Sequence, residues 1–495
     1  MNYIQQILTL FKNKILNAAG AERSLLEYIQ SGDISGAINL MQDRDEEVDN
    51  AIMEYNPETH KVMHRPDKFR SGKNPYRSVK SPRSRQDYIN EVELFFILGN
   101  PIEWKKKEGD DEAFTLFQDF LESQFYHDGM CTLKRLAGAE TEAAKLYHIY
   151  RENGEARVKS VILSRSEGYT LRPMFDQYGN LLAFAYGYKL KENGRTIQHW
   201  DIETPEFLFF TKRAGFGWEV QTFQNPTGKI NVIYAQQRKA WHGVQLRIER
   251  EEDLDSKEGD TNNYFADPIA TATADVIDSL ADPETIGKVI QLSTSNSTFG
   301  YVEPPRASES LASERKNLKD SILFDTYTPD LSYENLKGLG SLSGVAIKNA
   351  MAIGYIKRKR NIGYYKQLVR RDYSVMIEIL CFLHPEKADC LRAMKVEFEF
   401  AEPFDADNSE RNNGIISLYQ AGLISLEEAV RQVAACDDPD EEVRRIREDA
   451  EKKAEEKKSV ETDNETAENP EEIPQNPPSG GKIEQSAEAS QNEVR

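Results

Sequence analysis

The sequence predicts a mainly helical α+β chain that combines one long kinked helix with an antiparallel sheet. From Ala156 to Tyr234 polar and apolar residues alternate and β-branched and aromatic residues dominate, which is typical of strands. Elsewhere apolar residues recur every three to four positions, which is typical of amphipathic helices. The longest such stretch begins near Gly344 and contains no proline before Pro385. It predicts a helix of about 40 residues with kinks at Gly354 and Gly363.

The composition predicts a soluble, intracellular chain of two to four domains. The chain has 495 residues and a low mean hydropathy of −0.65. Its four cysteines form no CxxC pair, so we expect neither a disulfide framework nor a zinc site. The net charge is −20, and residues 437–495, with 19 acidic and 9 basic side chains, supply half of it. This balance argues against tight nucleic-acid binding, which needs clustered Lys and Arg, but it is compatible with a protein past which DNA slides.

The first 85 residues predict short helices followed by a basic arm. An amphipathic helix with Ile4, Ile7 and Phe11 on one face begins the chain, and we interpret it as a surface helix and not a signal peptide. A second helix is expected near residues 35–41. The arm, Lys61 to Arg85, contains nine Lys or Arg and one acid, as in an extended basic loop. Nucleic-acid contact and a solvated or intersubunit arm both remain open for it.

Helical and extended blocks then alternate along the chain. We expect helices at 88–98, 111–150, 241–265 and 269–280, a further helix that begins at Ser308 or Ser310, and strands within 156–234, at 299–302 and at 396–400. Residues 266–305 therefore form a small α/β knob between two helices. Ser425 and Glu428 make a capping box for a helix from Leu426 to about Val433, and another helix start lies at Asp438. From about Ser459 the composition predicts disorder.

No pattern in the sequence indicates a catalytic centre, a metal site or a cofactor. The glycines at 338, 340 and 344 lack the GxxxxGK[ST] spacing of a phosphate-binding loop, so we interpret them as a flexible loop. His60 and His64 are four residues apart, but the HExxH pattern is missing. We therefore expect no enzymatic activity.

Two basic clusters lie on predicted helices. They are Arg315, Lys316 and Lys319 on one, and Lys357, Arg358, Lys359 and Arg360 on the long helix, followed by Lys366, Arg370 and Arg371. Salt bridges within or between subunits and transient contacts with DNA phosphates both explain them. Four consecutive charges point to all sides of a helix, so they cannot share one role.

Several stretches, in this order, resemble the portal proteins of tailed bacteriophages. They are ELFFILGNPIEW (93–104), NPTGKINVIYAQQ (225–237), DTNNYFADPI (260–269), TPDLSYENLKGLGSLSGVAIK (328–348) and FEFAEPFDADNSE followed by LYQAGLISLEEAV. Together they span most of residues 50–445. The chain is thus similar to the head-to-tail connectors of long-tailed phages.

The resemblance implies a subunit of a ring, typically dodecameric, around a DNA channel. Its regions would be a wing at 1–240, stem helices at 241–265 and 306–325, a clip at 266–305, a tunnel loop at 326–344, the long helix and a wing return strand at 345–400, a crown at 401–458 and an acidic tail at 459–495. The tunnel loop would present Asp330, Asn335, Lys337, Gly338, Gly340, Ser343 and Gly344 to the channel. Asp282, Glu284, Lys288 and Glu303 of the clip would contact the terminase.

The implied partners are those of a capsid vertex. They would be further copies of this chain, double-stranded DNA, the terminase large subunit, the major capsid and scaffolding proteins, and a head-completion or adaptor protein, with no membrane and no cofactor. The protein would assemble in the host cytoplasm and stay in the virion. An oligomeric scaffold or adaptor that does not handle DNA remains the alternative, since long helices and an acidic tail fit that class too.

Overall fold

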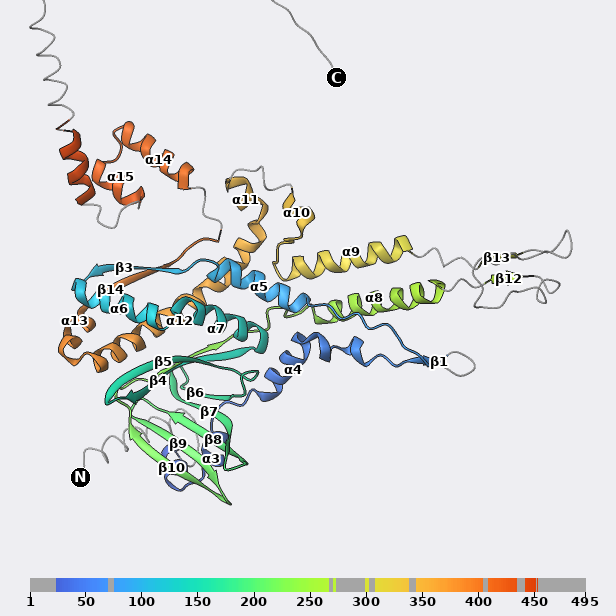
Figure 1. The fold of residues 1–495 in the computed structure, drawn as a ribbon, viewed down its shortest axis with the longest axis horizontal. Helices are drawn as coiled ribbons and strands as arrows, with labels where there is room; N and C mark the ends of the chain where they lie inside the picture. Colours follow the sequence, from blue (N-terminus) through green and yellow to red (C-terminus); the bar gives the residue numbers. More distant parts are fainter. Residues whose placement is uncertain are drawn as a thin grey trace, which may run out of the picture. The chain divides into compact units, whose positions relative to one another are not determined.

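The computed structural model describes residues 24–69, 75–266, 270–272, 299–301, 308–337, 344–403, 408–433, 441–450 and 452. The chain divides into two compact units, Met1–Asp405 and Ala406–Arg495. The first unit combines helices with antiparallel sheets (Figure 1), so the α+β prediction is confirmed. The expected surface helix at the N-terminus and the expected disorder of the tail lie outside the described residues.

Short helices begin the described part of the first unit. They are α2 (Leu25–Gln30), α3 (Ile34–Asn39), α4 (Asp45–Tyr55) and α5 (Arg85–Leu98), with two 3-10 turns, Pro57–Thr59 and Lys61–His64, and the short strands β1 (Lys68–Phe69) and β2 (Pro75–Tyr76) between α4 and α5. Ser24 begins α2 with a capping box, because its hydroxyl accepts from Glu27 N and its own N–H donates to the Glu27 carboxylate. The helix expected at 35–41 is α3.

Two antiparallel sheets follow where the sequence predicts strands. One has the order β10-β9-β8-β7-β6 and the other β11-β4-β5. Their strands are β4 (Glu142–Glu152), β5 (Glu155–Leu163), β6 (Thr170–Phe175), β7 (Leu181–Glu192), β8 (Arg195–Glu203), β9 (Phe207–Ala214), β10 (Gly217–Gln224) and β11 (Val232–Gln236). α2, α3 and the five-stranded sheet share one apolar cluster, which includes Leu25, Ile34, Trp200 and Ile202.

The prediction of a single helix at 111–150 is wrong. The segment instead contains α6 (Asp111–Ser123), α7 (Tyr126–Glu140) and strand β4. The Ala143 and Ala144 pair favours a helix locally, but β4 is hydrogen-bonded to β5 and β11, and Leu146 lies opposite Val232. Tertiary pairing therefore overrides a weak local preference.

Besides β4, the sequence analysis also missed strand β3. β3 (Ile102–Glu108) pairs with β14 (Lys395–Phe400), which confirms the strand expected at 396–400. Phe400 lies opposite Ile102, so this two-stranded sheet joins parts of the chain nearly 300 residues apart. Between α12 and β14 lie a 3-10 turn, Pro385–Lys387, and α13 (Ala388–Ala393).

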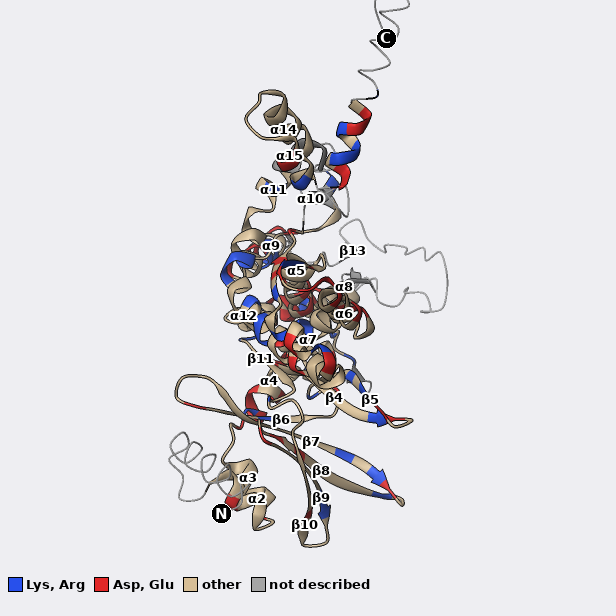
Figure 2. Ribbon diagram, turned by 90° about the vertical axis from the view of Figure 1, so that its left-hand side faces the viewer, with Lys and Arg blue, Asp and Glu red and all other residues tan. Residues whose placement is uncertain are grey.

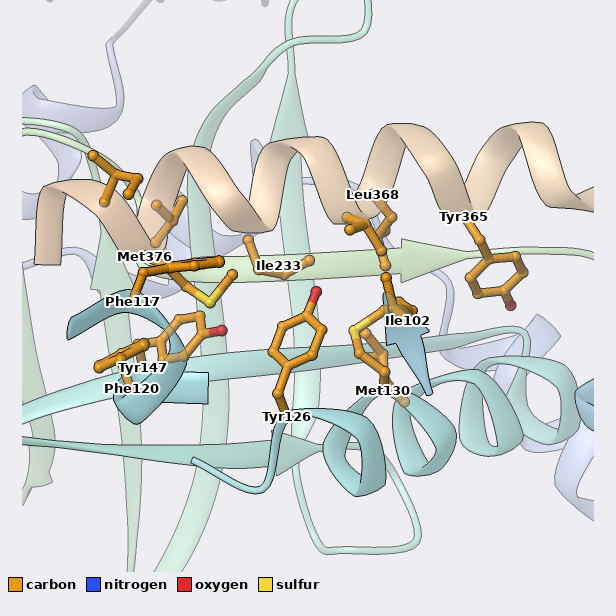
Figure 3. Packing of buried hydrophobic residues seen from close by; sticks show 14 of the residues in the cluster. Ile102, Phe117, Phe120, Tyr126, Met130, Tyr147, Ile233, Tyr365, Leu368 and Met376 are labelled. Carbon is orange, nitrogen blue, oxygen red and sulfur yellow. The ribbon is translucent and has the colours of Figure 1, made fainter. Parts of the chain in front are cut away.

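The main core lies under the long helix α12 (Ala352–Leu383). Tyr365, Leu368 and Met376 of α12 face Phe117 and Phe120 of α6, Tyr126 and Met130 of α7, and Tyr147 of β4 (Figure 3). The ring centroids of Trp104 and Phe117 are 5.1 Å apart in an edge-to-face arrangement. α6 and α12 therefore cover the same core, and Figure 2 shows them on opposite sides of this body.

The break in the long helix lies at Met351 and not at a glycine. α11 (Gly344–Ala350) and α12 are separate helices, and the buried side chain of Met351 packs with Val92 and Phe96 of α5. α12 continues through Gly354 and Gly363, where the sequence predicts kinks, so neither glycine ends the helix.

Gly354 has a packing role, which predicts the effect of replacing it. A Cβ atom here would lie 2.2 Å from Cζ of the fully buried Phe96. We expect Gly354→Ala to lower the free energy of unfolding by about 1–3 kcal/mol because the core is overfilled. Gly363→Ala is the matched control, since it enters open space and should stabilise the helix by up to about 1 kcal/mol. Equal midpoints of thermal unfolding for the two variants would contradict this close packing.

Two helices lie near the expected bounds 241–265 and 306–325; the first begins a few residues late, and the second begins at Ser308, as the sequence predicts. They are α8 (Gln245–Ala266) and α9 (Ser308–Asp325). Of the knob between them, the structure describes β12 (Ala270–Ala272) paired with β13 (Phe299–Tyr301). The start of the helix expected at 269–280 is therefore wrong, because its first residues form a strand; the rest lies outside the described residues.

The second unit contains α14 (Asn408–Gln420), α15 (Leu426–Val433) and a helix at 441–450. The N–H of Glu428 donates to Ser425 Oγ at 3.2 Å, so the predicted cap of α15 is confirmed.

Candidate functional site

α8 and α9 lie side by side and run in opposite directions (Figure 1). Arg247 near the start of α8 pairs with Asp325 at the end of α9. Arg315 of α9 binds Asp255 at 2.8 Å and also Glu258, both on α8. The guanidinium of Arg315, one of the residues predicted to contact DNA or a second subunit, is therefore held by carboxylates of its own chain.

The basic arm lies along α8 on its acidic residues. Lys61 Nζ is 2.7 Å from Glu249, Arg65 is 3.0 Å from Asp260, and Arg85 is 2.6 Å from Glu251. Arg83 pairs with Asp255. Lys61, Arg65, Arg83 and Arg85 of the arm therefore pair with acidic residues of α8 in the same chain, a role that the sequence analysis did not predict.

A buried histidine fixes the beginning of this arm. His60 Nδ1 is 2.6 Å from Glu252 Oε1, and its Nε2 is 2.8 Å from the carbonyl of Glu54. Burial acts to lower the pKa of His60, but the hydrogen bond and charge of Glu252 outweigh it, so the pKa of His60 is raised. The imidazole therefore joins α4, the arm and α8.

This geometry predicts a pH-dependent effect of His60→Gln. The pKa of His60 is higher in the folded than in the unfolded protein, so protonation of His60 contributes its full stabilisation below the unfolded-state pKa, near 6.5. This contribution is lost as the pH rises through the folded-state pKa. The variant should be destabilised by roughly 1.5–3 kcal/mol at pH 5.5, the range for a hydrogen bond to a charged group, and by less at pH 9. Thermal unfolding at both pH values measures the difference. A larger deficit at pH 9 would contradict the charged pair.

The segment between α9 and α11 contains a short helix, α10 (Tyr333–Lys337), so the stretch expected as a loop at 326–344 is partly helical. Asp330 accepts from Lys319 Nζ of α9 at 2.6 Å and from the N–H of Ser332 at 3.1 Å. Burial would raise the pKa of Asp330, but Lys319 and Ser332 lower it overall. Asn335 Nδ2 lies 3.5 Å from the Asp330 carbonyl, and the Lys337 side chain is exposed.

Of the predicted tunnel-loop residues, Gly344 begins α11. The tunnel-loop residues Gly338, Gly340 and Ser343 and the clip residues Asp282, Glu284, Lys288 and Glu303 lie outside the described residues.

The four consecutive cations of α12 point in different directions, as helical geometry requires. Arg358 donates to the carbonyls of Phe400 and Ala401 at 2.7 and 3.0 Å. Arg360 lies over the ring of Tyr327, 5.7 Å from its centroid. Lys359 is exposed and, like Lys316, makes no ion pair with a described residue.

Lys357 is buried in a charged cluster that the sequence analysis missed. Its Nζ donates to the Ile89 carbonyl and to Thr328 Oγ1, both at 3.2 Å, and lies 3.6 Å from Glu93. Lys134 is 3.5 Å from the same carboxylate, and Asn361 donates to it at 3.1 Å. Glu93 directly precedes the apolar segment LFFIL and could have been noticed for that reason, but the register of its partners needs the fold.

The pKa values in this cluster follow from burial and charge. Burial lowers the pKa of Lys357 to about 8, against the opposing charge of Glu93. For Glu93 burial acts to raise the pKa, and the two lysines together lower it. The cluster therefore fastens α12 and the end of α9 to α5 through paired charges.

A polar cavity of about 250 Å³ lies beside this cluster, between α5, the end of α9, α12 and the residues before α8. Its lining includes Gln237, His242, Thr326 and Arg360. Within the described ranges no group of three or more His, Cys, Asp or Glu could hold a metal ion. Among the helices that the structure describes, none is sufficiently long and apolar to cross a membrane. Cys131, Cys381 and Cys390 are free thiols.

Comparison with solved structures finds matches among chains of gene transfer agent particles. One match is a chain in the neck of a native gene transfer agent particle, computed with C12 symmetry. The match covers 72% of this chain and 95% of that chain, at 10% sequence identity and with a TM-score of 0.38. A chain of the virion of the native gene transfer agent particle matches over the same shares at 9% identity, also with a TM-score of 0.38. No curated protein sequence matches the chain.

The family comparison covers far more than half of the sequence. Residues 37–456 match the family described as phage portal protein, SPP1 Gp6-like. This range includes both sheets, α8, α9, the long helix and the capped helix α15. The chain belongs to the phage portal protein family of the SPP1 Gp6-like type.

Proposed function

We propose that this protein forms a ring at one vertex of a phage capsid and conducts double-stranded DNA into and out of it. The observation that carries the proposal is the family match over residues 37–456. In this role the protein has no catalytic task of its own. ATP hydrolysis belongs to the terminase, whose large subunit docks on the ring during packaging.

The described elements suit this role in the following way. α8 and α9 are the stem, the knob between them is the clip, and residues 326–344 are the tunnel loop. The sheets and α5–α7 belong to the wing, and the second unit, with α14 and α15, is the crown. The clip binds the terminase first and a head-completion or adaptor protein afterwards, while the wing meets the capsid and scaffolding proteins.

The internal pairing of basic residues supports a channel through which DNA slides. A channel lined with free Lys and Arg would retain DNA through the cumulative release of counterions. Here Arg315, Lys319 and four cations of the basic arm pair with carboxylates of the same chain. This pairing lowers the number of cations that are free to hold phosphates.

We therefore expect the tunnel of the assembled ring to be net negative along its length. The test is an electron cryomicroscopy structure of the ring, from which the surface potential of the lining is calculated. A lining that is positive along its length would contradict sliding.

The proposed function is tested by packaging. Phage particles made without this protein should be empty of DNA, and its expression in trans should restore filling. Filled particles in its absence would favour the alternative, an oligomeric scaffold or adaptor that does not handle DNA.

A further inference from the structure

A basic stripe runs along the exposed face of α12. Lys359, Lys366 and Arg370 are exposed and are seven and four residues apart, which places them on one side of the helix. Gly363 lies between them with open space around it. None of the three cations makes an ion pair or hydrogen bond with another described residue. Ile356, 54% exposed, extends the stripe by an apolar side chain.

An acidic stripe runs along the exposed face of α6. Asp119 and Glu122 are exposed and make no ion pair within the described part of the chain. Glu112, on the same side of α6, pairs only with the partly exposed Lys387. At about 1.5 Å per residue, the acidic stripe and the basic stripe are each roughly 15 Å long.

A groove of about 470 Å³ lies beside the acidic stripe. Its walls include Gln118, Leu121 and Glu122 of α6, Trp104 of β3, and Phe125 and Asp128 at the start of α7. Phe125 has a left-handed backbone with φ of 47°, and its side chain is 73% exposed. Such a conformation is uncommon for a bulky residue, so the local fold holds an apolar ring in solvent at the edge of an acidic groove.

The two stripes point away from each other within one subunit. α6 and α12 pack on the same core through Phe117 and Tyr365, and their exposed faces lie opposite those buried residues. Figure 2 shows the two helices on opposite sides of the body. An ion pair between the stripes is therefore impossible within one chain, whereas it is available between two copies that are arranged head to tail.

From this arrangement we propose that the basic stripe of α12 docks on the acidic stripe and groove of α6 in the next copy of this chain. A closed ring requires two different complementary patches on each subunit, which is what these stripes provide. Lys366 and Arg370 pair with Asp119 and Glu122, and Ile356 lies near Phe125. The inference rests on the proposed ring and names the surfaces that close it.

Charge reversal tests the interface in the full-length protein. Lys366→Glu/Arg370→Glu and, separately, Asp119→Lys/Glu122→Lys should weaken ring formation at low salt by about tenfold or more, because like charges then face each other. The variant with all four changes should recover rings. Lys189→Glu/Lys191→Glu and Glu58→Lys/Glu167→Lys change the charge equally at exposed positions outside both stripes and should assemble like the wild type. Native mass spectrometry measures the ring fraction, and circular dichroism confirms folding.

Zero-length crosslinking gives an independent readout. A carbodiimide should join Lys366 to Asp119 or Glu122 between isotopically light and heavy subunits. Wild-type rings without this crosslink, or stripe variants that assemble normally, would overturn the interface and leave the proposed function intact. A wild-type chain that remains monomeric would overturn both. Intact rings of the Lys366→Glu/Arg370→Glu variant that fill with less DNA would instead assign the basic stripe to DNA.

Discussion

Proline at both position 338 and position 340 should abolish DNA filling of capsids while ring assembly stays intact. The two glycines lie in the proposed tunnel loop between α10 and α11. Glycine permits backbone conformations that proline forbids, and proline fixes φ and removes the N–H donor. A loop that must adapt to moving DNA loses that freedom, whereas the stem and wing that hold the ring together are unchanged.

The measurement is the amount of DNA protected from nuclease in particles that contain the Gly338→Pro/Gly340→Pro variant. Gly480→Pro/Gly481→Pro is a matched control, because it makes the same two changes in the acidic tail. Normal filling in the loop variant would refute the tunnel-loop assignment. Loss of rings would show that the loop acts in assembly and not in translocation.

Asp372→Asn should destabilise the first unit by about 3–5 kcal/mol, the usual cost of breaking a buried ion pair. Asp372 of α12 is fully buried, pairs with Lys145 of β4 and accepts from the Tyr147 hydroxyl at 2.7 Å. The ammonium of Lys145 also lies 4.3 Å from the centroid of the Tyr126 ring. The asparagine would leave this ammonium buried without a counter-charge. The midpoint of thermal unfolding and the soluble yield measure the loss.

A double variant separates charge from packing. Lys145→Met/Asp372→Leu removes both charges and fills their volume, so it should recover most of the stability that the single change loses. A single variant as stable as the wild type, or a double variant no better than the single one, would contradict the account of a charge pair that fastens α12 to β4.

Periodicity predicted the elements whose burial is one-sided. Strands β5 and β10 alternate over about half of their length, and the stripe of α12 through Tyr365, Val369 and Met376 is buried as expected. β4 was missed because EAAKLYHIY has helix-forming alanines and is nearly all buried in its first half, so alternation is hidden. β3 was missed because its partner, β14, is nearly 300 residues away in the chain.

The helices that flank the candidate loop were predictable from the sequence, but the pairing of their charged side chains was not. The loop after Pro329 and the helices that flank it were recognisable from glycine, proline and spacing. Which cations are free depends on three-dimensional neighbours. Lys357 and Lys359 are two residues apart, yet the first is buried against Glu93 and the second is exposed. The break at Met351 likewise follows from packing on Phe96 and not from a helix-breaking residue.

The central claim, that this chain builds a DNA-conducting ring, is tested most directly by electron cryomicroscopy of the purified full-length protein. The account predicts closed rings with an axial hole wide enough for duplex DNA, with α8 and α9 beside that hole and the α12 stripe of one subunit against α6 of the next. Monomers, or closed assemblies without an axial hole, would contradict it.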